Sequence, residues 1–311
     1  MLGKEKLLIT GGLGNLGSWL TSYFSTKFDV YVLSKSVKNT LECNYKIIEC
    51  DITNLEALKE KLTIDFDYCI HTASYNEFFH ENYAKKALEV NTLGTRNLIE
   101  VLETKDIKNF IYLSTFHVYG VNEGIVHEET PLTPRNDYAS THLFAEYYLK
   151  QFYVNKKFPF VIFRLSNSYG RPKYINSSKW YLVLNDLVKS AYQNNKIVLN
   201  SNGKAKRDFI WMEDVCSVIE KSLLFESNMN NVFNLSSGQT FSVMELGQEV
   251  QKVYFNKYNK KIEILLNKND TTEKAILSVS NDKLRNVINY DFKNRIKNEI
   301  EAIFNLLEEG N

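Results

Sequence analysis

The sequence predicts an α/β fold, with a doubly wound parallel sheet in its first half and a smaller, mixed α/β domain towards the C-terminus. Three observations predict it. Short apolar runs alternate with longer amphipathic segments, a glycine-rich loop joins the first run to the segment after it, and the alternation loosens after Gly170. Strict alternation of strand and helix indicates a parallel sheet with right-handed crossovers.

Each predicted element follows from its length and apolar pattern. Six apolar runs have the length of buried strands, at residues 6–10, 30–33, 46–48, 68–71, 110–114 and 160–165. Apolar residues recur at helical spacing between them, in 55–62, 84–104 and 139–156. Beyond Gly170 a helix is expected around 179–194, and the stretch 285–309 ends in another.

Composition and charge narrow the possible partners. The 311 residues are 44% hydrophobic and 24% charged, as in ordinary globular proteins. A formal net charge of +1 gives no general attraction to nucleic acid or an anionic membrane, and no apolar run approaches the ~18 residues of a membrane span. Cys43, Cys50, Cys69 and Cys216 show neither C-x-x-C spacing nor a paired histidine nearby, so we expect reduced thiols and no metal site. These features predict a soluble, cytoplasmic protein.

The glycine-rich loop predicts a dinucleotide site of the Rossmann type. The strand that ends at Thr10 runs directly into Gly-Gly-Leu-Gly-Asn-Leu-Gly, and an apolar helix begins near Ser18. Glycines permit the tight turn and the close approach of a pyrophosphate, which then lies at the positive helix N-terminus. The residues expected to hold the cofactor here are Gly11, Gly14, Asn15, Leu16 and Gly17.

The adenosine half of the cofactor is less well specified. The second strand ends in Ser34-Lys35-Ser36, without the carboxylate that usually binds the ribose. Ser34 and Lys35 suit a 2′-phosphate, as in NADP, but Ser34 equally suits the plain ribose of NAD. Asp51 and Ile52 follow the third strand, where Asp51 either accepts a hydrogen bond from the adenine amino group or caps the helix near Asn54.

Hydroxyl-bearing side chains mark a candidate reaction centre. Residues 111–120 read Ile-Tyr-Leu-Ser-Thr-Phe-His-Val-Tyr-Gly, which places Ser114 and Thr115 at the end of a predicted strand. Ligands of such sheets bind beyond the carboxyl ends of the strands. Tyr138 opens the next predicted helix and shares one helix face with His142.

With these residues the chain resembles the extended short-chain dehydrogenase/reductase family, which includes nucleotide-sugar epimerases, dehydratases and dehydrogenases. The resemblance covers nearly the whole length. It is carried by Thr10-Gly11-Gly12-x-Gly14-x-x-Gly17, His71-x-Ala73, Asn91-x-x-Gly94-Thr95, Tyr138 and Arg164-x-x-Asn167-x-Tyr169-Gly170.

The resemblance implies a role for each of these side chains. The family uses a Ser or Thr and a Tyr to hydrogen-bond the reacting hydroxyl or ketone, and a Lys to hold the cofactor ribose and lower the pKa of the Tyr. Thr115 matches the first position, and Tyr138 would take the hydroxyl proton while C4 of the nicotinamide takes hydride. Ala73 is expected beside the cofactor, as are Tyr138 and His142.

His142 stands where the family has lysine. Bringing a tyrosine from its ordinary pKa near ~10 to ~7 requires about 4 kcal/mol, part of which a lysine ammonium supplies. A histidine of ordinary pKa is largely neutral at pH 7. His142 therefore bonds the ribose hydroxyls, is held charged by its neighbours, or marks weakened chemistry, and the sequence leaves these alternatives open.

The segment 207–215 is similar to the family segment in which an arginine binds the diphosphate of a sugar nucleotide. Arg207 matches that arginine, whose planar fork suits phosphate oxygens, and Asn167 matches an asparagine near the sugar. Two alternatives stay open: Arg207 pairs with Asp208 or Glu213, or Asn167 is simply a turn residue.

We therefore expect an NAD-dependent enzyme, with NADP possible, that oxidises C4 of a nucleotide-linked sugar as a 4-dehydrogenase or 4-epimerase. Dehydration is disfavoured, because dehydratases of this family place an Asp-Glu pair after the catalytic Thr, whereas Thr115 precedes Phe116-His117. The chain also resembles bacterial enzymes of capsular heptose pathways, which suggests a GDP-sugar. A dinucleotide-sensing regulatory protein is the alternative, favoured by His142.

The resemblance also implies domains and a homodimer. The dinucleotide-binding domain is expected over 1–170, with 205–236 returning to it, and the substrate domain over 171–204 and 237–311. In this family the helices matching 84–104 and 139–156 form the dimer interface, where the chain offers Phe144, Tyr147, Tyr148 and Phe152.

Overall fold

A computed structural model describes residues 4–37, 40–77, 80–224, 231–267, 269–271 and 275–310. Its main feature is a seven-stranded sheet in the order β3–β2–β1–β4–β5–β7–β11, with every neighbouring pair parallel. The strands are β1 (Lys6–Thr10), β2 (Asp29–Ser34), β3 (Lys46–Glu49), β4 (Tyr68–His71), β5 (Asn109–Thr115), β7 (Phe160–Leu165) and β11 (Asn231–Leu235). All six predicted strands are present, but β3 was wrongly expected to be buried: it lies at the edge of the sheet, pairs only with β2 and is largely exposed. At the other edge, β11 adds a returning strand.

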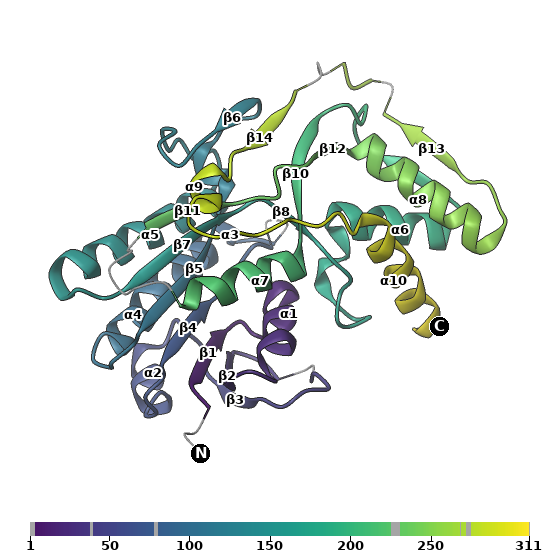
Figure 1. The fold of residues 1–311 in the computed structure, drawn as a ribbon. Helices are drawn as coiled ribbons and strands as arrows, with labels where there is room; N and C mark the ends of the chain where they lie inside the picture. Colours follow the sequence, from purple (N-terminus) through teal and green to yellow (C-terminus); the bar gives the residue numbers. More distant parts are fainter. Residues whose placement is uncertain are drawn as a thin grey trace.

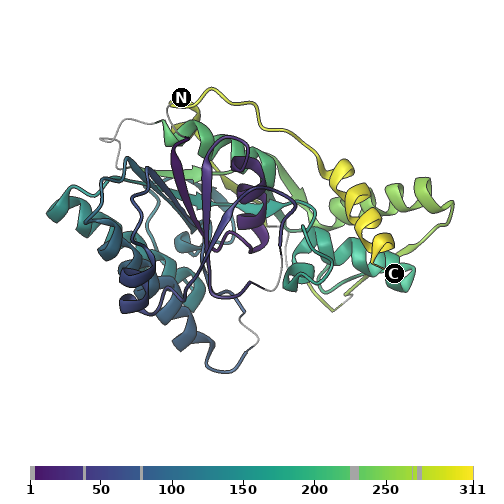
Figure 2. The ribbon, with the colours of Figure 1, turned by 90° about the horizontal axis from the view of Figure 1, so that it is seen from below.

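Helices cover both faces of the sheet (Figures 1 and 2). One face packs on α1 (Asn15–Phe24) and α7 (Met212–Leu223) through a core that includes Leu20 and Val215. The other packs on α2 (Leu55–Lys61), α4 (Thr95–Leu102) and α5 (Asp137–Lys156). The segment predicted as one helix over 84–104 is α3 (Tyr83–Ala87), a π-helical turn η1 (Leu88–Gly94) and α4 in direct succession.

The strand order reverses between β1 and β4. The chain leaves β1 towards β3 at one edge and returns on the other side of β1, so the connections diverge there. Thr10, His71 and Tyr112 are register partners across β1, β4 and β5. Ligands of open parallel sheets bind at such a switch point, outside the carboxyl ends of the strands.

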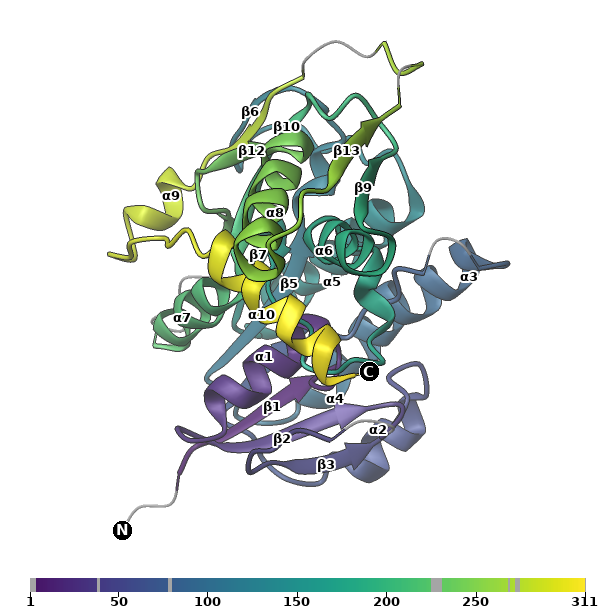
Figure 3. The same cartoon turned by 90° about the vertical axis from the view of Figure 1, so that its right-hand side faces the viewer.

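A smaller lobe of mixed structure stands over this end of the sheet (Figure 3). Its helices α6 (Val183–Asn194), α8 (Val243–Tyr258) and α10 (Ile296–Glu309) contact one another around their own apolar core, beside the strand pair β9 (Lys196–Leu199) and β13 (Glu263–Leu266). The helix predicted around 179–194 is split, with a 3₁₀ turn η3 (Ser178–Tyr181) ahead of α6. The predicted fold class is confirmed.

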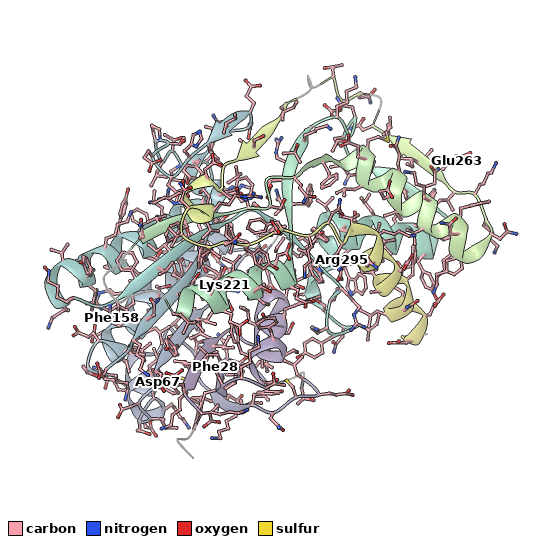
Figure 4. The ribbon with its side chains drawn as sticks, in the orientation of Figure 1. Phe28, Asp67, Phe158, Lys221, Glu263 and Arg295 are labelled. Atoms are coloured by element: carbon pink, nitrogen blue, oxygen red, sulfur yellow. The ribbon has the colours of Figure 1, made fainter. Side chains whose placement is uncertain are left out.

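Short strands join the lobe to the main sheet. β10 (Lys206–Trp211) lies between β8 (Asn167–Tyr169) and β12 (Thr240–Ser242), and β14 (Leu277–Val279) pairs with β6 (Gly124–Val126) beside the short helix α9 (Asp282–Arg285). Arg295, labelled in Figure 4 at the start of α10, donates its backbone N–H to the hydroxyl of Tyr169 at 2.8 Å. These contacts fix the lobe against the end of the sheet where the ligand is expected.

Candidate active site

A cavity of about 1090 Å³ lies at the carboxyl end of the sheet, lined by the loops after the strands and by the first turns of the smaller lobe. Of the residues predicted from sequence, it is lined by Gly11, Gly14, Asn15, Leu16, Gly17, Ser34, Lys35, Asp51, Ile52, Ala73, Thr115, Tyr138, His142 and Asn167. Arg207 is not among the lining residues. One cavity therefore brings together every predicted side chain except the arginine.

The tight conformation of the glycine loop leaves no space for a side chain at two of its glycines. Gly11 has φ +67, and a Cβ there would lie 2.8 Å from the Cα of Ala73. A Cβ on Gly17 would lie 2.1 Å from the Gly11 carbonyl oxygen, which closes the turn by accepting from Gly14 N–H at 2.8 Å. No alanine fits at either position without moving backbone.

Helix α1 starts at this loop with unused hydrogen-bonding capacity. Its N-cap, Gly14, has no side chain to satisfy the first N–H groups, which gives the helix end its affinity for anions. The buried Oδ1 of Asn15 has no hydrogen-bond partner within the described residues. The loop and the open helix end, which present N–H donors, fit the pyrophosphate half of a dinucleotide, whereas the orphaned oxygen of Asn15 requires a donor such as a ribose hydroxyl.

At the adenosine end, Asp51 and Lys35 are paired with each other. Lys35 Nζ lies 2.7 Å from Asp51 Oδ2, and Asp51 Oδ1 accepts from both the backbone and the hydroxyl of Thr53. Burial raises the pKa of Asp51, but the hydrogen bonds from Lys35 and Thr53 outweigh it and hold the pKa below its ordinary value. Asn54 caps α2 by accepting from Ala57 N–H, so the alternative that Asp51 caps this helix is wrong.

Thr115 and Tyr138 meet across the cavity floor. Thr115 ends β5, and its hydroxyl oxygen accepts from His117 N–H at 3.2 Å as the 3₁₀ turn η2 (Phe116–Tyr119) begins. Tyr138 is in the first turn of α5, which Asn136 caps by accepting from Ala139 N–H. Burial raises the pKa of Tyr138 to about 12, against the opposing effect of a hydrogen bond with Thr115.

His142 is buried below Tyr138, with their rings 4.6 Å apart in an edge-on arrangement. Its Nδ1 lies 2.7 Å from the hydroxyl of Tyr112, and its Nε2 lies 3.4 Å from the hydroxyl of Ser74. Burial and, secondarily, His117 lower the pKa of His142 to about 3. The low pKa favours a neutral His142 at pH 7, and no carboxylate contacts its ring among the described residues.

The tautomer of the neutral ring is assigned from the partners of its two nitrogens. Burial holds the pKa of Tyr112 well above its ordinary value, so its hydroxyl keeps its proton, and Nδ1 of His142 is the one hydrogen-bond partner of that hydroxyl among the described residues. We therefore assign the proton of this bond to Tyr112, which makes Nδ1 the acceptor. That leaves the ring proton on Nε2, on the side of Ser74 and the cavity. His142 thus offers the cavity one N–H donor without a charge.

Arg207 and Asn167 occupy β10 and β8, two paired strands. Arg207 donates from Nη1 to the carbonyl of Lys206 at 2.8 Å, while Asp208 is committed to Ser166 and Ser237. No carboxylate contacts Arg207 within the described residues, so the alternative pairing with Asp208 or Glu213 is wrong. Asn167 donates to the Asp208 carbonyl at 2.9 Å, which ties the two strands together.

Several polar residues to which the sequence analysis gave no role also line the cavity, among them Asn76, His117, Lys179 and Tyr181. Lys179 Nζ donates to Asn76 Oδ1 at 2.6 Å and lies 3.2 Å from the hydroxyl of Tyr181, so this contact bridges the smaller lobe and the loop after β4. The rule that ligands bind beyond strand ends would have found Asn76 and His117. No sequence pattern indicated Lys179 or Tyr181, which depend on how the lobe packs.

The described residues hold neither a metal-binding cluster nor a membrane-spanning helix. They contain no group of three or more His, Cys, Asp or Glu placed to hold a metal ion. Their helices include none that is long and apolar enough to cross a bilayer.

Known proteins resemble this chain in sequence and in structure. The dTDP-D-glucose 4,6-dehydratase of Dictyostelium discoideum is 29% identical over 279 residues, which are 79% of this chain but only 61% of that protein. The human enzyme of the same name is 27% identical, over 79% of this chain and 73% of its own.

Solved structures match the fold along nearly the whole chain. An epimerase of Methanothermobacter thermautotrophicus superimposes with a TM-score of 0.84 at 23% identity, covering 99% of this chain and 93% of its own. The UDP-glucuronic acid 4-epimerase of Bacillus cereus, solved with UDP-glucuronic acid and NAD, gives 0.81 at 20% identity over 98% and 100%. Residues 7–236 match the model of the NAD dependent epimerase/dehydratase family. The predicted family and the family's cofactor, NAD, are confirmed: this chain belongs to the NAD dependent epimerase/dehydratase family.

Proposed function

We propose that this protein oxidises C4 of a nucleotide-linked sugar with NAD, as a 4-dehydrogenase or as the first half of a 4-epimerase. The observation that carries the proposal is that Thr115 and Tyr138 line the same cavity as the glycine loop, close enough for the Thr115 hydroxyl to lower the pKa of Tyr138. Two hydroxyls converging beside a dinucleotide site suit one reacting C–OH group. Bound NAD supplies the hydride acceptor at C4 of its nicotinamide.

In this proposal Thr115 and Tyr138 position the sugar hydroxyl, and Tyr138 takes its proton. A proton acceptor must lie within hydrogen-bonding distance of the proton that it takes, and a hydroxyl held by both side chains meets this condition. With a pKa of about 12, Tyr138 is protonated at neutral pH, so the ionised form that accepts a proton is scarce. We therefore expect slow turnover near pH 7 that increases with pH.

His142 holds the cofactor ribose through its Nε2–H instead of acidifying Tyr138. The support is its neutral state, the donation from Tyr112 that leaves the proton on Nε2, and its place in the cavity wall. A neutral donor secures a ribose hydroxyl but does not stabilise a tyrosinate. The sequence left open whether His142 bonds the ribose, is held charged or marks weakened chemistry. In this proposal His142 bonds the ribose and, being neutral, does not lower the pKa of Tyr138.

The paired Lys35 and Asp51 favour NAD over NADP. Lys35 already has a carboxylate partner at 2.7 Å, and a 2′-phosphate placed near this pair would face the charge of Asp51. Like charges at close range are unfavourable, whereas an uncharged ribose hydroxyl meets no such repulsion. Ser34, the residue before Lys35, could also bind the ribose, although its hydroxyl donates to the Ser36 carbonyl at 2.8 Å.

On the substrate side, we propose that Asn167 contacts the sugar and that Arg207 binds the diphosphate. The support for Arg207 is its half-buried guanidinium without a carboxylate partner in the described part of the chain. Burial lowers its pKa, and an anion would compensate the buried charge. A GDP-heptose of bacterial surface polysaccharide synthesis is the first substrate to test.

Residues 171–204 and 237–311 would form the substrate domain, opposite the dinucleotide-binding domain of residues 1–170 and 205–236.

We further propose a homodimer through α5 and η1. Leu88, Leu93, Phe144 and Tyr147 are 44–51% exposed and line a shallow depression of about 430 Å³. Of the other two predicted interface residues, Tyr148 lines the same depression while packing partly against the core beneath, and Phe152 packs against that core without lining the depression. A second copy of the same surface would cover this apolar patch.

The unpaired cysteines, three of them buried, support a cytoplasmic location.

A dinucleotide-sensing protein is the second candidate, favoured by the neutral His142 and the high pKa of Tyr138. Incubation with NAD and a panel of GDP-, UDP- and dTDP-sugars, at neutral and alkaline pH, separates the two. An enzyme forms NADH and a keto sugar, faster at alkaline pH. If NAD binds tightly but none of these sugars reduces it at either pH, the sensor is correct and the enzyme proposal fails.

A further inference from the structure

The ammonium group of Lys179 lines the cavity and contacts no carboxylate among the residues that the structure describes. Its Nζ donates to Asn76 Oδ1 at 2.6 Å and lies 3.2 Å from the hydroxyl of Tyr181, and both of these partners are uncharged. Burial lowers the pKa of Lys179, whereas the charge of Glu77 opposes this from further away. A half-buried cation with neutral partners leaves its charge to be balanced by a ligand.

The surrounding turn holds this ammonium in place. The backbone N–H of Lys179 donates to the Ser177 hydroxyl at 3.2 Å. The Lys179 carbonyl accepts from Leu182 N–H and from the side-chain amide of Asn185, both at 3.2 Å. Asn185 is buried, so the turn η3 is tied to the interior of the smaller lobe. A group that is fixed before the ligand arrives loses little freedom on binding, which favours a binding role.

Lys179 stands at the sugar half of the cavity. Its partner Asn76 follows Ser74 by two residues, and the Ser74 hydroxyl lies 3.4 Å from Nε2 of His142. Two residues of chain span at most about 7 Å. The ammonium is therefore held beside the proposed reaction centre and not at the adenosine end of the cavity.

The structure thus offers two separate cations to a nucleotide sugar. Arg207 of β10 acts electrostatically on His117, beyond Thr115, and is the residue proposed to bind the diphosphate. Lys179 belongs to the turn η3 and contacts the loop after β4. A neutral sugar carries negative charge only on its diphosphate, so it would leave Lys179 without a counterion. A sugar with a carboxylate of its own would pair with both cations.

We propose that Lys179, with the amide of Asn76, binds a carboxylate on the sugar, so that the substrate is a nucleotide-linked hexuronic acid. The inference rests on the proposed function, because it takes C4 of the sugar to lie at Thr115 and Tyr138. C1, which carries the diphosphate, is opposite C4 on a hexose ring, whereas the carboxylate of a hexuronic acid is attached to C5, next to C4.

The two side chains supply donors for both carboxylate oxygens. The ammonium of Lys179 pairs with one oxygen. Asn76 Nδ2, which donates to none of the described residues, is a donor for the other. The hydroxymethyl group of a neutral hexose, or the uncharged side chain of a heptose, would leave the ammonium unpaired. The site therefore narrows the substrate from neutral sugars to acidic ones.

The test compares sugars that differ only at C6. The NAD-loaded full chain is titrated by calorimetry with UDP-glucuronic acid against UDP-glucose, and with GDP-mannuronic acid against GDP-mannose. Wild type should bind the acid of at least one pair about 10- to 150-fold more tightly. Lys179→Met should remove this preference by weakening only the acid, and Lys179→Arg should retain most of it. Lys196→Met is the matched control, because Lys196 is exposed and outside the cavity.

The wild-type comparison does not depend on how any variant folds, and NAD affinity reports the folding of the variants. Equal affinity of wild type for acidic and neutral sugars would overturn the proposal, and NADH formed from the neutral sugar would then leave the C4 oxidation intact. Equal weakening of both sugars by Lys179→Met would also overturn it, because the ammonium would then bind the diphosphate. Tight binding of the acid without NADH formation, at neutral and alkaline pH, would instead refute the C4 oxidation and support the carboxylate site. If no sugar of either pair binds, both proposals fail.

Discussion

The substitution His142→Lys tests whether a missing positive charge is what keeps Tyr138 weakly acidic. In the structure no cation contacts Tyr138 within the described residues, and its pKa is about 12. Lysine at position 142 would bring an ammonium group to the place where the neutral imidazole lies, with the hydroxyls of Tyr112 and Ser74 as hydrogen-bond acceptors. A nearby cation favours the tyrosinate and lowers the pKa of Tyr138.

The size of the shift follows from Coulomb's law. The two rings are 4.6 Å apart, which we take as a separation of about 6 Å between the ammonium and the phenolic oxygen. At an effective dielectric constant of about 20 this charge contributes about 2.8 kcal/mol. That is about two pKa units, from about 12 to about 10. The tyrosinate fraction at pH 8 rises about 100-fold, and because a weaker base is less reactive, the rate should rise about 10- to 100-fold.

The assay is single-turnover reduction of NAD by the preferred nucleotide sugar, from about pH 6 to about pH 10. The wild-type rate should increase throughout this range, because the whole range lies below the pKa of Tyr138. The lysine variant should be faster near pH 8, and its rate should begin to level off near the lowered pKa of about 10. His142→Gln is the matched control, because its amide can replace the hydrogen bonds to Tyr112 and Ser74 without adding a charge.

Identical pH profiles for the lysine and glutamine variants would refute the electrostatic reasoning. The same holds for a wild-type rate that is already independent of pH near pH 7. Either result would mean that another group sets the ionisation of Tyr138 or that Tyr138 is not the proton acceptor.

Three other substitutions test the remaining assignments. Tyr138→Phe should lower hydride transfer by about 10²- to 10⁴-fold without changing NAD affinity in calorimetry, and an unchanged rate would exclude Tyr138. Gly17→Ala should abolish NAD binding, because its Cβ would lie 2.1 Å from the Gly11 carbonyl oxygen, whereas Gly247→Ala, with its nearest neighbour at 3.6 Å, should bind NAD normally. Arg207→Ala should weaken nucleotide-sugar binding by about 2–3 kcal/mol, or roughly 30- to 150-fold, and leave NAD binding unchanged. An unchanged dissociation constant for the sugar would place the diphosphate site elsewhere.

The sheet could be predicted because its strands are continuous apolar runs. Strands such as 6–10 and 68–71 are buried on both faces, which leaves a pattern that sequence reasoning recognises. The edge strand β11 was missed because Asn231–Leu235 gains its place only by pairing with β7, far away in the chain. The break at Leu182 between η3 and α6 was likewise not visible in the apolar spacing.

At the site, the residue types could be predicted from the sequence, but their hydrogen-bond and ion-pair partners could not. Asp51 was ambiguous between a ligand and a helix cap until Asn54 was seen to cap α2. His142 was ambiguous because its charge depends on burial, which a sequence does not report; only packing under Tyr138 makes it neutral. Arg207 was ambiguous until Asp208 was found bonded to Ser166 and Ser237.

The sequence by itself determined the family, the glycine loop and the order of strands and helices, because these depend on residue type and on neighbours a few positions apart. The tertiary structure alone decided which charges are paired, which rings are neutral, and that Lys179 of the smaller lobe reaches Asn76 beyond β4. Ionisation and contact depend on what surrounds a group in space, and those surroundings come from segments remote in the chain.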